Sequence, residues 1–224
     1  MMNAKRISVL LVILALLTLG TMVVADTVAT GPISSQDAGK KETGFGDLLA
    51  DALRTASNAN IAFVAAVSCK PGTIPAGPVT EAQLSAMLQN PGEVWAVSKL
   101  TGAQVQAAME KSFSRLPGTN NGLLQVAGIK VKFDPDGGRN SRVKSITVGT
   151  APGSETYAPL DPAKQYRVAM PLSLAKGGLG YFTIFDAAKI EGDPSTQSLL
   201  QALTGFASGK ASITYPGTGR LIAQ

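Results

Sequence analysis

The sequence of 224 residues predicts a single α+β (mixed α/β) domain in which helices flank mixed β-sheets. Apolar residues recur at helical spacing in four segments, and alternating or continuous apolar runs lie between these segments. The predicted order is helix, strand, helix, strand, helix, hairpin, strand, helix, strand, without an internal repeat. With 45% hydrophobic residues, the chain is long enough to bury one good core.

The N-terminal residues have the features of an export signal. Lys5 and Arg6 precede an uncharged apolar run, and Val23-Val24-Ala25 offers small residues at the positions that a signal peptidase recognises. We therefore expect residues 1–25 to be a cleaved signal peptide, with the folded protein exported to the periplasm or the extracellular space. An uncleaved N-terminal membrane anchor is the alternative, because the apolar stretch approaches the length that spans a bilayer.

The domain is expected to occupy residues 42–224. Residues 26–41 are small and polar, so they predict a flexible lead-in. The first helix follows at 43–55, where five apolar residues fall on one face: Phe45, Leu48, Leu49, Ala52 and Leu53. Acidic residues near its start suit the helix dipole.

The middle of the chain alternates strands with short helices. Residues 60–67 are almost all apolar and predict a strand that is covered on both faces. A turn-rich loop follows, and Thr80 with Gln83 then predicts a capping box at the start of a helix. Residues 93–100 predict a further strand, and Thr101 with Gln104 repeats the capping box.

The second half predicts a hairpin and a glycine-rich bend. Residues 123–133 alternate as a long strand that can bend at Gly128, and residues 142–148 form its antiparallel partner. A strand at 165–170 then runs into Pro171–Tyr181, where three glycines let the backbone turn tightly. A helix at 195–207 and a short strand at 211–215 complete the prediction.

Composition excludes several classes of function. The sequence holds no histidine, so Ser-His-Asp and Cys-His mechanisms are excluded, and no metal or other cofactor is expected. The single cysteine, Cys69, has no intramolecular disulfide partner. Without Lys5 and Arg6 the chain would carry 18 basic and 15 acidic residues, a net charge of +3. These charges are scattered without an aromatic platform, which argues against nucleic-acid binding.

Seven short motifs resemble, in the right order, the C-terminal domain of the 5'-nucleotidase and UDP-sugar hydrolase family. They are Glu42–Ala52 (similar to ETNLGNLIADA), Ile61–Phe63, Pro75–Thr80 (GxIT), Lys99–Gly102 (xLTG), Leu124–Gly128 (LQVSG), Lys176–Tyr181 (NGGDGY) and Gly219–Leu221 (GRI). The resemblance covers the chain from about residue 42 to its end. It implies the fold of that domain.

The resemblance also implies that the two domains of the family's enzymes have different roles. In this family an N-terminal metallophosphoesterase domain holds two metal ions on Asp, His and Asn ligands. The C-terminal domain stacks the base between two aromatic rings and delivers the phosphate to the metals. This sequence resembles the C-terminal domain alone and contains no histidine, so we expect a stand-alone copy without the family's metal site.

At the positions that match the family's nucleotide contacts, the residue types differ. Lys70 stands near the place of a phosphate-facing arginine, and it lacks the planar fork of that side chain. Leu123 and Ser173 stand where the resemblance places the two stacking rings, and Leu179 replaces the aspartate that binds ribose. Leucine and serine supply neither a π face nor a ribose acceptor.

The glycine bend preserves more of the family pattern. Gly177 and Gly178 keep the turn, and Tyr181 keeps the aromatic position after it. Tyr181 or Phe182 could supply a ring to a ligand, and the simpler interpretation is that they pack into the core. The sequence therefore predicts a degenerate nucleotide site, for which binding of a nucleotide or nucleoside is doubtful.

Three functions follow as hypotheses. The first is an exported domain that is non-catalytic alone and that binds another ligand or an exported partner protein. The alternative is the substrate-binding part of a nucleotidase system in nucleotide catabolism, acting with a separate metallophosphoesterase chain. The third is an enzyme that uses Cys69 beside Lys70 as a nucleophile, which is disfavoured because no general base is identifiable.

Overall fold

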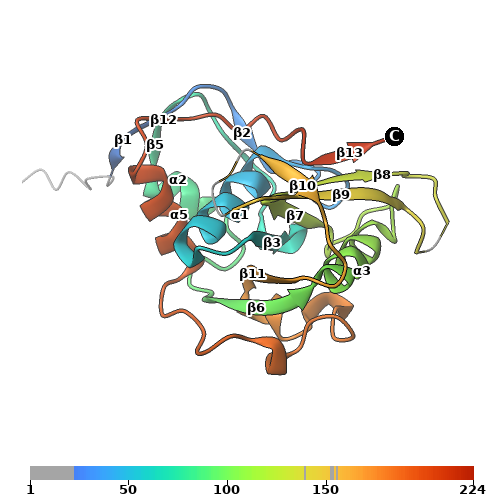
Figure 1. The fold of residues 1–224 in the computed structure, drawn as a ribbon. Helices are drawn as coiled ribbons and strands as arrows, with labels where there is room; N and C mark the ends of the chain where they lie inside the picture. Colours follow the sequence, from blue (N-terminus) through green and yellow to red (C-terminus); the bar gives the residue numbers. More distant parts are fainter. Residues whose placement is uncertain (1–22, 139, 152–153, 155) are drawn as a thin grey trace, which may run out of the picture.

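The computed structural model describes residues 23–138, 140–151, 154 and 156–224, and it confirms an α+β fold (Figure 1). Helices and strands are interspersed along the described chain, and the strands form four β-sheets. The helices are α1 (Gly44–Ser57), α2 (Glu81–Ala86), α3 (Gly102–Phe113), α4 (Leu172–Ala175) and α5 (Leu199–Ser208). Within the described residues, no helix is both long and apolar enough to span a bilayer.

The central sheet is mixed, as predicted. Its strand order is β6-β11-β3-β7, formed by β6 (Trp95–Thr101), β11 (Gln165–Pro171), β3 (Ile61–Ala65) and β7 (Leu124–Ala127). Strands β11 and β3 run parallel, and the outer strands are antiparallel to their neighbours. Every residue of β3 is buried, which is the environment that its continuous apolar run predicts.

A second sheet has the order β10-β9-β8-β13 and forms one side of the molecule (Figure 1). Its strands are β10 (Tyr157–Pro159), β9 (Val143–Gly149), β8 (Ile129–Phe133) and β13 (Leu221–Ala223). The predicted long strand 123–133 is divided into β7 and β8 at Gly128, which has a positive φ of 79°. A side chain there would collide with the Asn60 carbonyl, so glycine is required at this bend.

Local helix signals proved accurate. At α2 and α3 the N-cap threonine accepts a hydrogen bond from the backbone three residues later, and Gln83 or Gln104 accepts one from the N-cap backbone in return. Both predicted capping boxes are therefore confirmed. A third capping box, between Ser198 and Gln201, opens α5, so this helix begins later than the predicted 195.

The prediction of a flexible lead-in at 26–41 is wrong. This segment contains most of β1 (Val23–Ala29), which lies between β12 (Ser212–Ile213) and β5 (Gly77–Thr80). It also contains β2 (Ile33–Ser34), which pairs with β4 (Thr73–Ile74). Residues 1–22 of the predicted signal peptide lie outside the described residues, and the predicted cleavage before Asp26 would fall within β1.

The start of the lead-in escapes detection because a polar side chain points inward there. Thr27 is fully buried, and its hydroxyl donates to the Ala207 carbonyl (2.7 Å) and to the Lys210 carbonyl (2.8 Å) at the end of α5. Val28, by contrast, is 40% exposed. A strand whose polar residue is buried and whose apolar residue is exposed gives no amphipathic signal in the sequence.

Candidate functional site

The glycine-rich bend after β11 is a tight turn set by its backbone. Gly177 has a φ of 88°, and an added Cβ would lie 2.6 Å from the Phe182 Cα and 2.8 Å from the Phe185 carbonyl oxygen. Leu179 also adopts a left-handed conformation, with a φ of 58°, although it carries a side chain. The chain therefore keeps a shape here that favours glycine, even where the residue is leucine.

Tyr181 belongs to the core. It is 1% exposed, its hydroxyl donates to the Gly122 carbonyl (2.7 Å), and its ring stacks on Phe185 with the centroids 5.0 Å apart. Burial raises the pKa of this phenol above its usual range. The neighbouring Phe182 is 70% exposed, so it is the ring of this loop that is open to a ligand.

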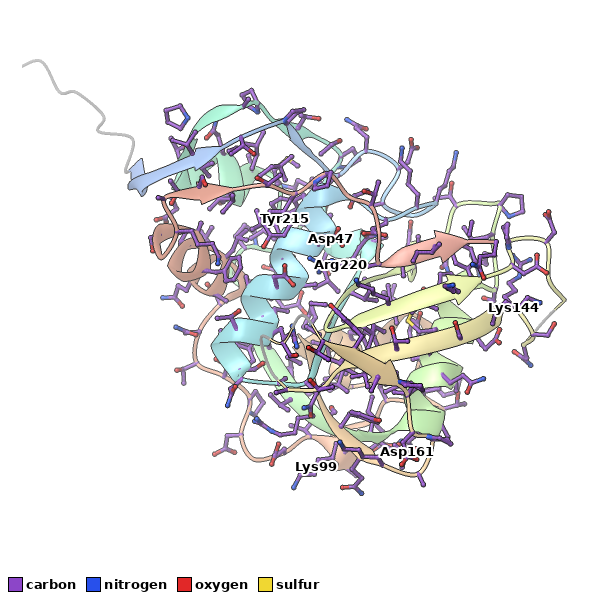
Figure 2. All side chains as sticks on the ribbon, turned by 45° about the horizontal axis from the view of Figure 1, so that its top comes forward. Asp47, Lys99, Lys144, Asp161, Tyr215 and Arg220 are labelled. Carbon is purple, nitrogen blue, oxygen red and sulfur yellow. The ribbon has the colours of Figure 1, made fainter. Side chains whose placement is uncertain are left out.

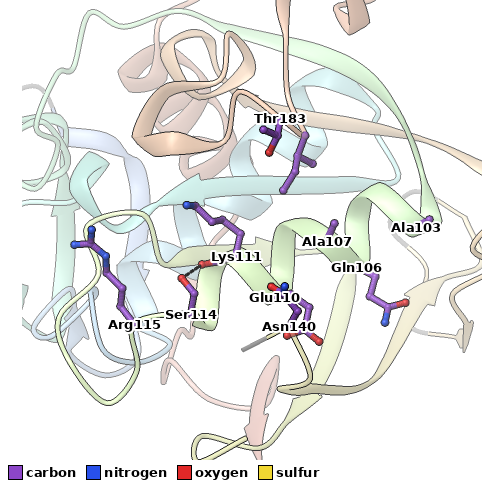
Figure 3. Close-up of a pocket in the computed structure, with 10 residues that line it drawn as sticks. Ala103, Gln106, Ala107, Glu110, Lys111, Ser114, Arg115, Asn140 and Thr183 are labelled. Carbon is purple, nitrogen blue, oxygen red and sulfur yellow. Dashed lines mark hydrogen bonds between the residues drawn. The ribbon is translucent and has the colours of Figure 1, made fainter. Parts of the chain in front are cut away.

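Two adjoining cavities lie between α3 and the loop that follows β11. The first has a volume of about 530 Å³ and is lined by Lys111, Ser114, Arg115, Thr119, Asn120, Asn121, Gly122, Leu179 and Tyr181. The second, shown in Figure 3, has a volume of about 880 Å³ and also extends to Asn140 and Thr183. Lys111, Ser114 and Arg115 line both cavities, so we treat the two as one site and call it the α3 groove.

The structure brings together only some of the predicted site residues. Leu179 and Tyr181 line the α3 groove. Leu123 is fully buried and lines a separate apolar cavity of about 280 Å³ beside Phe113 and Phe133. Leu123 therefore offers no surface to a ligand in the α3 groove. The lack of an aromatic ring at residue 123 consequently says nothing about whether the α3 groove binds a nucleoside.

The remaining predicted positions lie elsewhere. The Ser173 hydroxyl donates to a Glu93 carboxylate oxygen (2.6 Å), so this side chain is already occupied by a neighbour. Lys70 is exposed, and its backbone N–H donates to the Met87 carbonyl (2.8 Å). Neither residue is among those lining the α3 groove.

Cys69 is unsuited to nucleophilic chemistry. It is buried, and burial raises the pKa of its thiol to about 12, so it is a neutral thiol at physiological pH. Among the described residues, no group of three or more His, Cys, Asp or Glu side chains is placed to hold a metal ion.

A partly buried ionic cluster, which the sequence did not predict, joins the two ends of the domain (Figure 2). We call it the Arg220 cluster, and it consists of Glu42, Asp47, Asp51, Tyr215 and Arg220. The Arg220 guanidinium donates to both carboxylate oxygens of Asp51, at 2.7 and 3.0 Å. The Tyr215 hydroxyl donates to the same carboxylate at 3.0 Å.

The acidic residues of the cluster differ in their roles. The Glu42 carboxylate accepts the backbone N–H groups of Arg220 (2.9 Å) and Leu221 (2.6 Å), which fixes the start of β13. Asp47 is 3% exposed, and its Oδ1 lies 3.6 Å from the Arg220 Nε without forming a hydrogen bond to any described atom. Burial raises the pKa of Asp47 to about 9, against the opposing charge of Arg220. The cluster is therefore a structural clasp rather than an open site.

One signal in the sequence could have indicated the clasp. Its three acids lie in the first matched motif, Glu42–Ala52, and its arginine lies in the last, Gly219–Leu221. Charged residues that belong to motifs at opposite ends of a domain, and that fall near an apolar helix face, are candidates for a buried pair. We had related the acidic residues near the start of this helix only to the helix dipole.

Comparisons with known proteins support the family that the motifs indicate. A family model described as the 5'-nucleotidase, C-terminal domain matches residues 21–187. Snake venom 5'-nucleotidase from Naja atra is 35% identical over 123 residues, which cover 54% of this chain and 22% of that protein. The 5'-nucleotidase of Bos taurus is 32% identical over 147 residues, which cover 65% of this chain and 25% of that protein.

Solved structures share the fold. The 5'-nucleotidase precursor from Thermus thermophilus has a TM-score of 0.79 at 25% identity, covering 90% of this chain and 39% of that one. The NAD nucleotidase of Haemophilus influenzae has a TM-score of 0.77 at 17% identity, covering 91% and 38%. The chain thus spans about a fifth to a quarter of the length of the curated relatives, and the resemblance to the C-terminal domain is confirmed.

Proposed function

Because the chain belongs to the 5'-nucleotidase C-terminal domain family, we propose that it is an exported binding domain that is non-catalytic alone and whose nucleoside site is degenerate. The main support is the glycine turn, which keeps its backbone while Ser173 and Leu179 occupy the positions of the ring and the acid. Leu179 cannot accept a hydrogen bond from a ribose hydroxyl, and Ser173 is bonded to Glu93. The absence of histidine from the sequence and the buried Cys69 support a role in binding or assistance.

We expect adenosine to give no measurable heat in isothermal titration calorimetry with the purified protein. The reason is that neither base stacking nor ribose recognition has a side chain to perform it at these positions. AMP and UDP-glucose are titrated in parallel, and adenosine discriminates best because it carries no phosphate. Adenosine binding in the micromolar range would overturn the proposal.

A matched variant sharpens this test. The substitution L179D restores an acid at the position of this turn that lines the α3 groove, and aspartate tolerates the left-handed backbone at 179 better than leucine does. The variant is expected to bind adenosine more tightly than the wild type. Equal and tight binding by both proteins would instead place the nucleoside outside this turn.

The second candidate is the substrate-binding part of a nucleotidase system. It is favoured by the relatives, since proteins named 5'-nucleotidase match this chain over only 22–25% of their own length. A separate metallophosphoesterase chain would then supply the catalytic metals. Mixing the two purified chains is expected to raise the phosphatase rate with AMP, and an unchanged rate at saturating concentrations of this domain would eliminate the candidate.

A further inference from the structure

We propose that the apolar cavity beside Phe113 and Phe133 binds a small aliphatic carboxylate, with its chain inside and its charge at Lys40 and Lys41. We call this space, of about 280 Å³, the Phe113 cavity. It shares no lining residue with the α3 groove. The inference goes beyond the proposed function, because the ligand has no base, ribose or phosphate.

The inner wall of the Phe113 cavity is apolar. Phe113 on α3 and Phe133 on β8 line it, and their rings stack with the centroids 4.1 Å apart and the planes 11° apart. Leu116 and Leu123 also line it, and they are 7% and 0% exposed. Water finds few hydrogen-bond partners in such a space, so cavities of this kind accept apolar molecules.

The cavity has an entrance. Pro117, from the loop after α3, and Ala223, from β13, line the same space and are exposed to solvent. The apolar part of a ligand can therefore enter between these segments without unfolding of the core.

Two lysines supply positive charge to this entrance. Lys40 and Lys41 line the cavity, are exposed, and take part in none of the ion pairs found among the described residues. Their backbone is held in place, because both N–H groups donate to the Asp37 carbonyl (2.7 and 3.1 Å). The Lys41 carbonyl also accepts a hydrogen bond from the Gln125 amide (2.9 Å). The protein therefore fixes two ammonium groups beside an apolar space.

The acid that lines the cavity is already engaged elsewhere. Glu42 is 6% exposed, and both of its carboxylate oxygens accept the backbone N–H of Arg220 (3.1 and 2.9 Å). One of these oxygens also accepts the N–H of Leu221 (2.6 Å). A buried carboxylate repels a second anion nearby. The charge of a ligand therefore belongs at the exposed lysines, and its apolar part belongs inside.

The volume limits the length of the ligand. At roughly 30 Å³ for each non-hydrogen atom, the share of a molecule in liquid water, the cavity holds about nine such atoms. The chain of octanoate fits this volume, whereas the chain of dodecanoate exceeds it. Because the lysines are exposed, we expect the binding to weaken as salt is added.

The test is isothermal titration of octanoate into the full chain at low ionic strength. We expect a dissociation constant below about 1 mM, given the number of methylene groups that would leave water. Hexanoate is expected to bind about fifteenfold more weakly, since each methylene contributes about fourfold. Dodecanoate is expected to gain no more than about fourfold over octanoate, because the cavity is then full.

Two results of this series would overturn the proposal. One is an absence of octanoate binding at about 10 mM. The other is an affinity that keeps rising by about fourfold per methylene as far as dodecanoate, because adsorption to an open apolar surface would then explain it.

The charged part of the site is tested with K40Q/K41Q. This variant is expected to weaken octanoate about threefold to fivefold, the scale of an exposed charge pair, and to leave 1-octanol unchanged. The matched control is K130Q/K132Q, which removes the same charge from the exposed face of β8, the strand whose other face carries Phe133. An equal loss in the control would overturn the role of the two lysines.

The apolar part is tested with A223W, which places a large ring at the entrance and is expected to abolish octanoate binding. The control I222W puts the same ring on the neighbouring residue of β13, which does not line the cavity. Circular dichroism verifies that both variants are folded. Unchanged octanoate affinity in folded A223W would overturn the proposal. Adenosine titration bears only on the nucleoside site, so this proposal and the proposed function fail separately.

Discussion

Replacing Arg220 with alanine is expected to lower the free energy of unfolding by about 3–5 kcal/mol. The substitution would leave the carboxylate of Asp51 without its two guanidinium donors, and that carboxylate is 24% exposed. It would also remove the donor to the Val126 carbonyl (2.7 Å) at the edge of β7. Breaking a partly buried pair is costly because an uncompensated charge remains.

Urea denaturation at pH 7 measures this effect, with two variants for comparison. R220K keeps the charge and loses the bidentate contact, so it is expected to fall between the wild type and R220A. K144A removes an exposed pair with Asp134, whose atoms are 3.3 Å apart, and is expected to cost less than about 1 kcal/mol. If R220A costs no more than K144A, the Arg220 cluster does not hold the domain together.

The sequence predicted those features that depend on neighbours along the chain. Thr80 and Thr101 identify the N-termini of α2 and α3 because a capping glutamine lies three residues after each of them. The β3 segment is recognisable because a run of apolar residues reports burial on both faces. In each case, the interaction that determines the structure is local or is expressed in the hydrophobic pattern.

Contacts between segments that are far apart in the sequence could not be predicted from local sequence patterns. Glu42 and Arg220 are 178 positions apart, so no local pattern indicates that one binds the backbone of the other. Thr27 likewise satisfies carbonyls near the C-terminus of α5, 180 and 183 positions away. A polar residue whose partner lies far along the sequence has the same sequence signal as a polar residue in solvent.

The candidate site was predictable only in part. The motif located the glycine turn and Leu179, which lie at the groove, because a turn of glycines is visible in the sequence. It also suggested Leu123, which lies in the core, because sequence spacing does not tell which side of a strand faces a cavity. Lys111 and Arg115, which line the groove, were overlooked because cations at and just beyond the end of a helix are typical of a solvent-exposed surface.

Substituting Asp47 with asparagine is expected to change how stability depends on pH. Relative to the wild type, the free energy of unfolding of D47N should be higher at alkaline pH than at acidic pH. Burial is the largest cause that raises the pKa of Asp47, from its ordinary 3.8 to about 9. Glu42 and Asp51 raise it further, Arg220 lowers it, and the buried thiol of Cys69 also lies within its electrostatic reach. We therefore expect Asp47 to be protonated in the folded state at neutral pH.

The sign of the pH dependence follows from these values. Between about pH 4 and pH 9 the folded protein retains a proton on Asp47 that the unfolded chain has released. The contribution of protonated Asp47 to the free energy of unfolding is fully present below pH 3.8 and is lost as the pH rises through 9. Asparagine is neutral at every pH, so D47N removes this dependence and keeps a donor for the Glu42 carboxylate.

Asparagine is also the residue in the family motif ETNLGNLIADA at the position of Asp47, and a protonated aspartate resembles it in charge and in donor capacity. The free energy of unfolding of D47N relative to the wild type is expected to rise by about 1.4–4 kcal/mol between pH 5 and pH 8. Urea denaturation at both values measures this difference. The surface acids with lowered pKa values, such as Asp134 and Glu191, are common to both proteins and cancel in the comparison. If the two proteins differ by the same amount at pH 5 and pH 8, Asp47 is ionised in the fold, and the clasp then contains three carboxylates around one guanidinium.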